Sequence, residues 1–364
     1  MIFLPTNQLM PGMVISRDIR LYDYEDYTTI MLKRGETLTE AYIRRLKACG
    51  FAGAYINDGV NDDVVIEGTI DEDLKIKAVA GIKQLYINFK GQSDAMVIRQ
   101  IDTIGAITEN LIEDISSNSQ FMTSIIDLKM YDDYTYHHCL SVAVLSIAMG
   151  ITMGYNTHKL YELGLCAMLH DIGKLDIPLE ILNKPARLSR EEFTIIKLHP
   201  LYGANYFKGK NIIPPLAFDG ILSHHERVDG LGYPYGLSGK DIPVFGRILS
   251  IADVYDALTS NRPYRRPNLP SEAIEYIMGG VGTFFDEEFV RVFLRKVAPY
   301  PVGTCVRLSN GIIGIVIKNH ESQPLRPIVR NIEDESDQYD LFGDPKLRSV
   351  VVTGLGYNQT GFLL

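Results

Sequence analysis

Five of the eight histidines lie mostly where helical periodicity directs a side chain into a core: His138, His170, His199, His224 and His225. His138 shares one helix face with three apolar residues that follow it at spacings of four and three: Val142, Leu145 and Met149. His170 ends a similar stripe that begins at Leu163 and continues through Ala167. Both imidazoles are therefore expected to face a core, where a neutral imidazole can bind a metal ion.

Three further histidines, His199, His224 and His225, follow apolar residues at similar spacing, and Asp171 and Asp253 lie in apolar helical stretches. Each alone is more simply a satisfied core histidine or a helix-packing aspartate. Together they would be costly to bury unpaired, and a shared cation offsets that cost. Nitrogen and oxygen donors without thiolate suit Fe, Mn or Zn. The surplus of ligands predicts two metals about 3.5–4 Å apart that share a carboxylate and act on a phosphorus centre.

The composition excludes several classes of protein. The 364 residues are 46% hydrophobic and carry a net charge of −9, which excludes global disorder and general binding to nucleic-acid polymers. The four cysteines form no CxxC pair, as expected of a reduced protein. The N-terminus does not resemble a signal peptide, and the most apolar window is shorter than the ~20 residues that span a bilayer. We expect a cytoplasmic protein without a membrane partner.

Periodicity predicts a multidomain, mainly α fold in four segments. Residues 1–66 form a small α+β module with short strands near 13–15, 28–32 and 54–56 and a helix from Thr39 to Cys49. Residues 67–124 form a helical connector; the helical region 71–130 is a hairpin or a dimerisation stalk. Residues 125–298 form the all-α core, and residues 299–364 a C-terminal β unit whose first hairpin turns at Asn310-Gly311 in a type I′ turn.

Three motifs carry a family resemblance. They are the run from His170 to Lys174 (HDIGK), the run from His224 to Arg227 (HHER) and the run from Asp229 to Pro234 (DGLGYP). Together they resemble the HD-GYP family, bacterial cyclic di-GMP phosphodiesterases of the HD metal-dependent phosphohydrolase superfamily. The resemblance covers residues 125–298 and implies an all-α HD-type core. The N-terminal module and the C-terminal strands resemble units that accompany such domains.

The resemblance implies a ligand set for the two metals. Residue by residue, the family's ligands fall on seven positions: His138, His170, Asp171, His199, His224, His225 and Asp253. Some family members bind a third metal through a glutamate one turn before the first histidine, where this chain has Tyr134. A phenol with a pKa near 10 is a poor ligand at neutral pH, so we expect two divalent ions. Iron is the first expectation and manganese the second.

The resemblance also implies substrate contacts. Asp171 and Lys174 are the expected catalytic residues, and Lys174 and Tyr233 would contact the nucleotide. Asp229, Gly230, Gly232 and Pro234 would shape the loop at the substrate mouth. Arg262 and Arg265 flank a Pro-Tyr pair in the densest basic cluster of the chain, which suits a second phosphate or a guanine edge. Asp256 would orient a ligand histidine or Lys174, or lie on the helix surface.

The implied activity is hydrolysis of cyclic di-GMP to pGpG, GMP or both, in second-messenger signalling. Two alternatives remain open. The first is another cyclic dinucleotide, such as a mixed GMP–AMP ring, because the metal motifs do not contact the base. The second is a non-catalytic receptor or scaffold, against which the intact His170-Asp171 pair argues. A homodimer through residues 71–130 and protein signalling partners for the flanking units are further expectations.

Overall fold

The computed structural model describes residues 2–21, 29–49, 51, 53–57, 70–117, 134–184, 186–260, 268, 270–320, 322–334, 336–358 and 361–362. The chain forms two compact units. Unit 1 comprises Met1–Gly68, Lys129–Asp132 and Val297–Leu364, and unit 2 comprises Thr69–Leu128 and Asp133–Lys296. The four-segment division stays a prediction; the two units group those segments in pairs.

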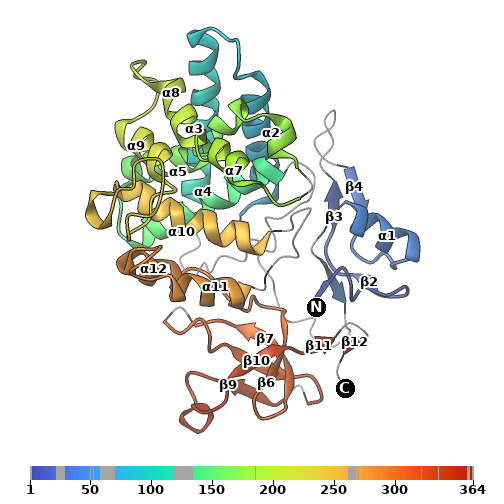
Figure 1. The fold of residues 1–364 in the computed structure, drawn as a ribbon. Helices are drawn as coiled ribbons and strands as arrows, with labels where there is room; N and C mark the ends of the chain where they lie inside the picture. Colours follow the sequence, from blue (N-terminus) through green and yellow to red (C-terminus); the bar gives the residue numbers. More distant parts are fainter. Residues whose placement is uncertain are drawn as a thin grey trace. The chain divides into compact units, whose positions relative to one another are not determined.

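The first part of unit 1 is a three-stranded antiparallel sheet in the order β1-β5-β2, beside the hairpin β3-β4 (Figure 1). Its elements are β1 (Ile2–Pro5), β2 (Val14–Ile15), β3 (Ile19–Leu21), β4 (Thr29–Leu32), α1 (Glu40–Ala48) and β5 (Gly53–Asn57). Helix α1 begins where the sequence predicts, because the Thr39 hydroxyl accepts the backbone N–H of Tyr42 and caps the first turn. The apolar faces of the sheet and of α1 close over one core.

The second part of unit 1 is a five-stranded antiparallel sheet in the order β10-β6-β7-β8-β9 (Figure 1). Its elements are β6 (Cys305–Leu308), β7 (Ile313–Lys318), β8 (Ile328–Asn331), β9 (Gln338–Asp340), η4 (Pro345–Leu347) and β10 (Val352–Leu355), followed by the β11 (Tyr357–Asn358) and β12 (Gly361–Phe362) pair. The type I′ turn predicted between β6 and β7 is wrong. Gly311 alone adopts a positive φ, 91°, while Asn310 does not, and the Leu308 carbonyl accepts the Gly311 N–H. The loop is therefore one residue longer than expected.

The two sheets of unit 1 belong to one packed body. The backbone N–H of Phe3 donates to the Gly303 carbonyl at 3.1 Å, and Phe3 forms a parallel bridge with Thr304. Ile315 of β7 is buried in the core of the N-terminal sheet. The ends of the chain thus fold together, which no local sequence pattern indicated.

The regular elements of unit 2, among its described residues, are all helices. Its elements are α2 (Glu72–Asn88), α3 (Asp94–Ser117), α4 (Tyr134–Thr152), α5 (Thr157–Leu169), η2 (Ile172–Asp176), α6 (Leu179–Leu182), α7 (Arg190–Ile196), α8 (His199–Phe207), α9 (Pro215–Ser223), η3 (Gly239–Asp241), α10 (Val244–Thr259), α11 (Pro270–Gly279) and α12 (Glu287–Leu294). The predicted fold class is confirmed: a mainly helical core, a small N-terminal sheet and a C-terminal antiparallel sheet.

Helix α4 is the centre of unit 2, packed by α5 and α10 (Figure 1). Its stretch Thr135–Thr152 is, among the described helices, the one long and apolar enough to cross a membrane, yet 78% of it is buried inside the structure. A helix that is apolar on all sides can lie in the core of a protein, where neighbouring helices bury it. The hydrophobicity of α4 is therefore explained by the core.

Helices α2 and α3 pack on this core rather than extending as a separate stalk. Helix α2 contacts α4, and α3 contacts α5. The turn between α2 and α3 passes through Gly91, whose φ of 78° marks the predicted helix break. Residues 118–133, which include the second predicted break, lie outside the described residues. The homodimer contact stays a prediction.

Candidate metal centre and substrate loop

Seven side chains from five helices and the turns after them converge inside unit 2. They are the set that the sequence analysis assigned to metal binding: His138, His170, Asp171, His199, His224, His225 and Asp253. Most stand at helix ends, where α5, α8 and α9 begin or stop. The ligand atoms form two groups, and within each group all of them lie within 4.8 Å of one another. One group is Asp171, His199, His224 and His225, and the other is His138, His170 and Asp171.

Asp171 belongs to both groups and lies at their centre. Its Oδ1 is 3.3 Å from Nε2 of His199 and 4.0 Å from Nε2 of His224. Its Oδ2 is 3.5 Å from Nε2 of both His138 and His170. One carboxylate oxygen therefore faces each group, which is the arrangement of a carboxylate that bridges two cations.

Asp253 also contacts a histidine of each group. Its Oδ1 lies 3.2 Å from Nε2 of His138, and its Oδ2 lies 3.7 Å from Nδ1 of His225. Helix α10 delivers this carboxylate into the core, together with Asp256 one turn later. The Asp256 carboxylate is buried and accepts the Nδ1–H of His138 at 2.7 Å. Asp256 thus orients a histidine of the cluster rather than lying on the surface.

The remaining histidines of the helix ends are oriented by backbone. His170, His199 and His224 each direct Nδ1 at the carbonyl oxygen three residues earlier, at 2.6, 2.8 and 2.7 Å. With the proton on Nδ1, each ring presents the Nε2 lone pair to the cluster. Such outer hydrogen bonds fix the tautomer and ring plane of metal-binding histidines.

The charge states fit a cation site. Burial lowers the pKa of His199 to about 3 and that of His225 to about 4, and it also lowers the pKa of His170 and His224. Neutral imidazoles are the form that binds metal. Burial alone would raise the pKa of Asp171, yet Lys174 and the histidines hold it well below its usual value, so the carboxylate stays charged.

Unsatisfied atoms provide the test of whether these residues fit a metal. His170 Nε2 and Asp171 Oδ1 are buried without a hydrogen-bond partner. The Nε2 atoms of His199 and His224 lie 3.1 Å apart. Because both rings donate through Nδ1, two lone pairs face each other, and a cation between donors removes that repulsion. The site therefore fits two adjacent cations held by nitrogen and oxygen donors, without thiolate.

Lys174 and Tyr233 lie at the edge of the cluster. Lys174 Nζ donates to Oδ2 of Asp171 at 2.5 Å and is partly exposed. The Tyr233 ring stacks on the His225 ring, with centroids 4.7 Å apart. The backbone N–H of Tyr233 donates to the backbone carbonyl of His225 at 3.1 Å. The loop that carries Tyr233 therefore rests directly on the metal cluster.

Glycines let this loop fold tightly. Gly230 has a φ of 75°, which disfavours side chains with a Cβ. A Cβ on Gly232 would lie 2.4 Å from the Arg227 backbone nitrogen, so the loop approaches the preceding chain too closely for any larger residue. Asp229 pairs with Arg227, and its Oδ1 accepts the Leu231 N–H at 3.0 Å. Pro234 follows Tyr233 in the same loop.

Comparison with known proteins agrees with this geometry. Residues 109–289 match the family model of the HD domain, and residues 305–344 match a KOW domain associated with the HD domain. The chain belongs to the HD-domain proteins of the HD-GYP type. The predicted family is therefore confirmed, and the C-terminal sheet is the associated KOW-like unit.

Two curated relatives and one solved structure are similar to this chain. Cyclic di-GMP phosphodiesterase PA4108 of Pseudomonas aeruginosa is 38% identical over 241 residues, 65% of this chain and 58% of the relative. 3'3'-cGAMP-specific phosphodiesterase 1 of Vibrio cholerae is 32% identical over 213 residues, 58% of this chain and 43% of the relative. Bd1817, an HDG"Y"P protein from Bdellovibrio bacteriovorus, shares the fold with a TM-score of 0.51 and 20% identity, covering 80% of this chain and 97% of that chain.

Some expected site residues of the HD-GYP domain lie outside the described residues. Arg262 and Arg265 fall in residues 261–267, and nothing is described of the Tyr134 side chain, although Tyr134 begins α4. Their roles stay predictions. Lys197 Nζ lies over the ring of Tyr233, 6.0 Å from the ring centroid. The sequence analysis missed Lys197, whose only pattern is a position two residues before His199.

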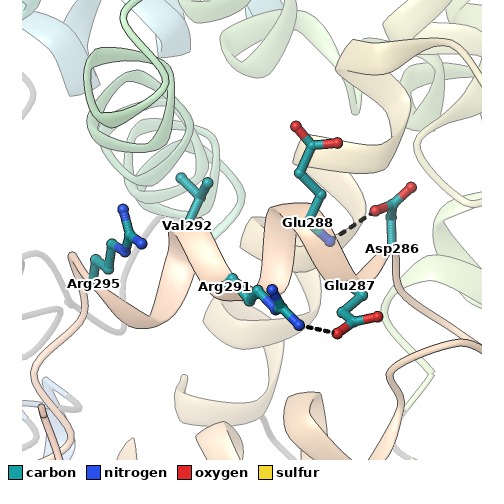
Figure 2. Close-up of a pocket in the computed structure, with 6 residues that line it drawn as sticks. All are labelled: Asp286, Glu287, Glu288, Arg291, Val292 and Arg295. Atoms are coloured by element: carbon teal, nitrogen blue, oxygen red, sulfur yellow. Dashed lines mark hydrogen bonds and ion pairs between the residues drawn. The ribbon is translucent and has the colours of Figure 1, made fainter. Parts of the chain in front are cut away.

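The pocket shown in Figure 2 is separate from the predicted site residues. It is lined by α12 and its start: Asp286, Glu287, Glu288, Arg291, Val292 and Arg295. Arg291 pairs with Glu287 at 2.5 Å, and the backbone N–H of Glu288 donates to Asp286 at 2.9 Å (Figure 2). The Asp286 carboxylate also pairs with Arg247, at 2.8 Å. None of its lining residues belongs to the HD-GYP metal cluster.

Glu226 is a second residue that the sequence analysis did not single out. Its carboxylate is 2% exposed and accepts the backbone N–H of Tyr235 at 2.8 Å and of Leu237 at 3.0 Å. Glu226 therefore anchors the loop directly after Pro234. The clue in the sequence is its place directly after the His224-His225 pair, where a buried carboxylate needs partners.

Replacing Glu226 with glutamine should raise KM for the substrate about tenfold while leaving the metal content unchanged. The glutamine amide can accept only one of the two N–H groups, and its NH2 group would face the other, so the Tyr233 loop loosens at a cost of about 1–3 kcal/mol. Steady-state kinetics and metal analysis of the same preparation provide the measurement. The matched control is Glu287→Gln, whose side chain is exposed on α12. A Glu226→Gln variant with wild-type KM would contradict the anchoring role.

Proposed function

We propose that this chain is a metal-dependent phosphodiesterase that hydrolyses cyclic di-GMP to pGpG, GMP or both. The observation that carries the proposal is Asp171, whose two oxygens face two separate groups of buried histidines. The names of the curated relatives supply the substrate class. The chain spans 58% of the first of those relatives, so activity and substrate are proposed for this chain rather than transferred whole.

The proposed cofactor is a pair of divalent ions, iron first and manganese second. His199, His224 and His225 would hold one ion, His138 and His170 the other, and Asp171 and Asp253 would serve both. When bound, such ions polarise a phosphodiester and stabilise the charge that develops on its oxygens. The neutral imidazoles of His199 and His225 and the charged carboxylate of Asp171 are ready for this role at neutral pH. His138 must first lose a proton, because hydrogen bonds to Asp253 and Asp256 outweigh its burial and raise its pKa to about 9.

The chain's own residues complete the site. Lys174, held by Asp171, places a positive charge where the 3′ oxygen departs. Tyr233 supplies a ring beside the cluster on which a base or ribose can rest, and its loop, with Asp229, Gly230, Gly232 and Pro234, forms the substrate mouth. Cyclic di-GMP has a second phosphate, for which we propose Arg262 and Arg265, whose guanidinium groups suit bidentate contacts.

Two substitutions should separate chemistry from binding. Lys174→Ala should mainly lower kcat, because its charge is needed most when the leaving oxygen becomes negative, whereas Arg262→Ala should mainly raise KM. We expect about a hundredfold in kcat for the first and about tenfold in KM for the second. Steady-state kinetics on both variants is the measurement. Equal changes in both parameters for both variants would contradict these roles.

A mixed GMP–AMP ring is the second candidate substrate. One curated relative is named as a 3'3'-cGAMP-specific phosphodiesterase, and it matches 58% of this chain, against 65% for a relative named for cyclic di-GMP. The residues proposed to hold the metals would act on the phosphate rather than on the base, so they do not distinguish the two rings. Parallel kinetics with the two rings decides between them by the ratio of kcat/KM.

The cellular setting follows from the same proposal. A cyclic dinucleotide hydrolase acts in second-messenger signalling, and we propose a cytoplasmic protein whose KOW-like and N-terminal units contact signalling partners. A homodimer through residues 71–130 belongs to this proposal.

Chromatography of the products tests the activity. Anaerobically purified protein with Fe(II) or Mn(II) should convert cyclic di-GMP to pGpG or GMP, and a chelator should stop the reaction. Product formed equally well with the chelator would favour a different activity. Binding of cyclic di-GMP without product, with either metal, would favour the receptor role.

A further inference from the structure

The C-terminal end of α2, residues 86–90, touches three elements that carry the metal cluster. Tyr86 meets α4, Phe89 meets α8, and Lys90 meets η2. The HD family model begins at residue 109, inside α3, so this end lies outside it. None of the three residues that make these contacts is among the predicted site residues.

Tyr86 reaches α4 next to a metal-binding position. Its side chain is buried, and its hydroxyl lies 3.3 Å from Sγ of Cys139, the residue after His138. Its ring also meets the Tyr136 ring edge to face, with centroids 5.6 Å apart. The two contacts lie on either side of His138 in the sequence and therefore hold the first turn of α4.

Phe89 and Lys90 reach the other two elements. The Phe89 ring is buried, with centroids 4.8 Å from Tyr206 and 5.8 Å from Phe207. Both partners lie on α8, which begins at His199. Lys90 Nζ is 2.6 Å from Oδ1 of Asp176, at the end of the η2 turn that contains Lys174.

We propose that the end of α2 is a positioning element of the metal cluster, and this rests on the proposed metal-dependent function. Metal–ligand distances are tolerated only within about 0.2 Å, so elements that bring ligands from separate parts of the chain must be fixed relative to one another. Residues 86–90 fix α4, η2 and α8 together. The helical connector of the sequence analysis is therefore part of the catalytic unit.

The test compares two truncations of buried side chains. Phe89→Ala removes the contact with α8, whereas Ile107→Ala opens the seam between α3 and Gly81 of α2, a contact that involves none of the seven cluster residues. The readout is equilibrium binding of Mn²⁺ to the metal-free full chain, with thermal unfolding of the same samples. We expect Phe89→Ala to weaken Mn²⁺ binding about 10- to 100-fold, as loss of an outer support does. Ile107→Ala should lower the melting temperature and keep wild-type affinity.

Two further variants, Phe89→Leu and Tyr86→Phe, test the contacts of residues 86–90. Phe89→Leu, which keeps an apolar side chain there, should restore most of the affinity. If Phe89→Ala does not fold, Tyr86→Phe still tests the proposal, because loss of one hydrogen bond should weaken Mn²⁺ binding about fivefold. Wild-type affinity in the alanine or phenylalanine variant, or an equal loss in Ile107→Ala, would overturn it. Wild-type protein that binds Mn²⁺ without hydrolysing cyclic di-GMP would refute the proposed function and leave this comparison intact.

Discussion

Replacing Asp171 with alanine is expected to reduce hydrolysis at least about a thousandfold, more than the 10- to 100-fold typical of losing an outer support of a metal site. The carboxylate is 1% exposed and faces four imidazole nitrogens and Lys174. Without it, both groups of histidines lose their shared anion, and the charge of Lys174 is left beside a buried cavity. Metal content should fall together with turnover.

Metal analysis and kinetics on the same preparation provide the measurement. Asp171→Asn separates charge from shape, and we expect it to lose activity nearly as fully, because a neutral amide cannot bridge two cations. Asp241→Asn, an exposed carboxylate in η3, is the matched control and should behave as wild type. An Asp171→Ala protein that retained two metals and ordinary turnover would contradict the bridging role.

Gly173→Ala is expected to destabilise unit 2 by about 3 kcal/mol and to lose metal, although it adds a single methyl group. A Cβ at this position would lie 2.0 Å from the His199 carbonyl oxygen and 2.4 Å from the Gly203 nitrogen. Both atoms are backbone, so no side chain can rotate away. The start of α8 would have to move from η2, and His199 would move with it.

Urea unfolding of the metal-free protein measures this effect, with Mn²⁺ binding as a second readout. Gly279→Ala is the control, since a Cβ at the end of α11 meets nothing within 4 Å; its stability should change by less than about 0.5 kcal/mol. Equal free energies of unfolding for the two alanine variants would show that the close approach of η2 and α8 does not contribute to stability.

Features with a local cause were predictable from the sequence. The helix from Thr39 to Cys49 follows from its cap, and the buried stripes of α4 and α5 follow from apolar residues at spacings of three and four. The same stripes placed His138 and His170 on inward faces, and the structure brings them together with Asp171. Spacing within one helix carries this information because it fixes which residues share a face.

Features that depend on distant contacts were not predictable. The N-terminal and C-terminal strands share one unit because Phe3 meets Gly303 and Thr304, residues separated by most of the chain. Glu226 acquires its role from the backbone of a loop nine to eleven residues later. Phe89 acquires its role from α8. The spacing of apolar residues predicts which residues share a face of one helix or strand, and it does not predict which elements contact one another.

The central claim is that two cations at the Asp171 cluster enable hydrolysis of cyclic di-GMP. The most direct measurement is a titration of metal-free protein with Fe(II) or Mn(II) under anaerobic conditions, with bound metal and cyclic di-GMP turnover followed in the same samples. The account predicts that turnover rises with bound metal and stops rising at two ions per chain. Turnover that is independent of metal, that saturates at one or three ions, or that is absent with two ions bound would contradict it.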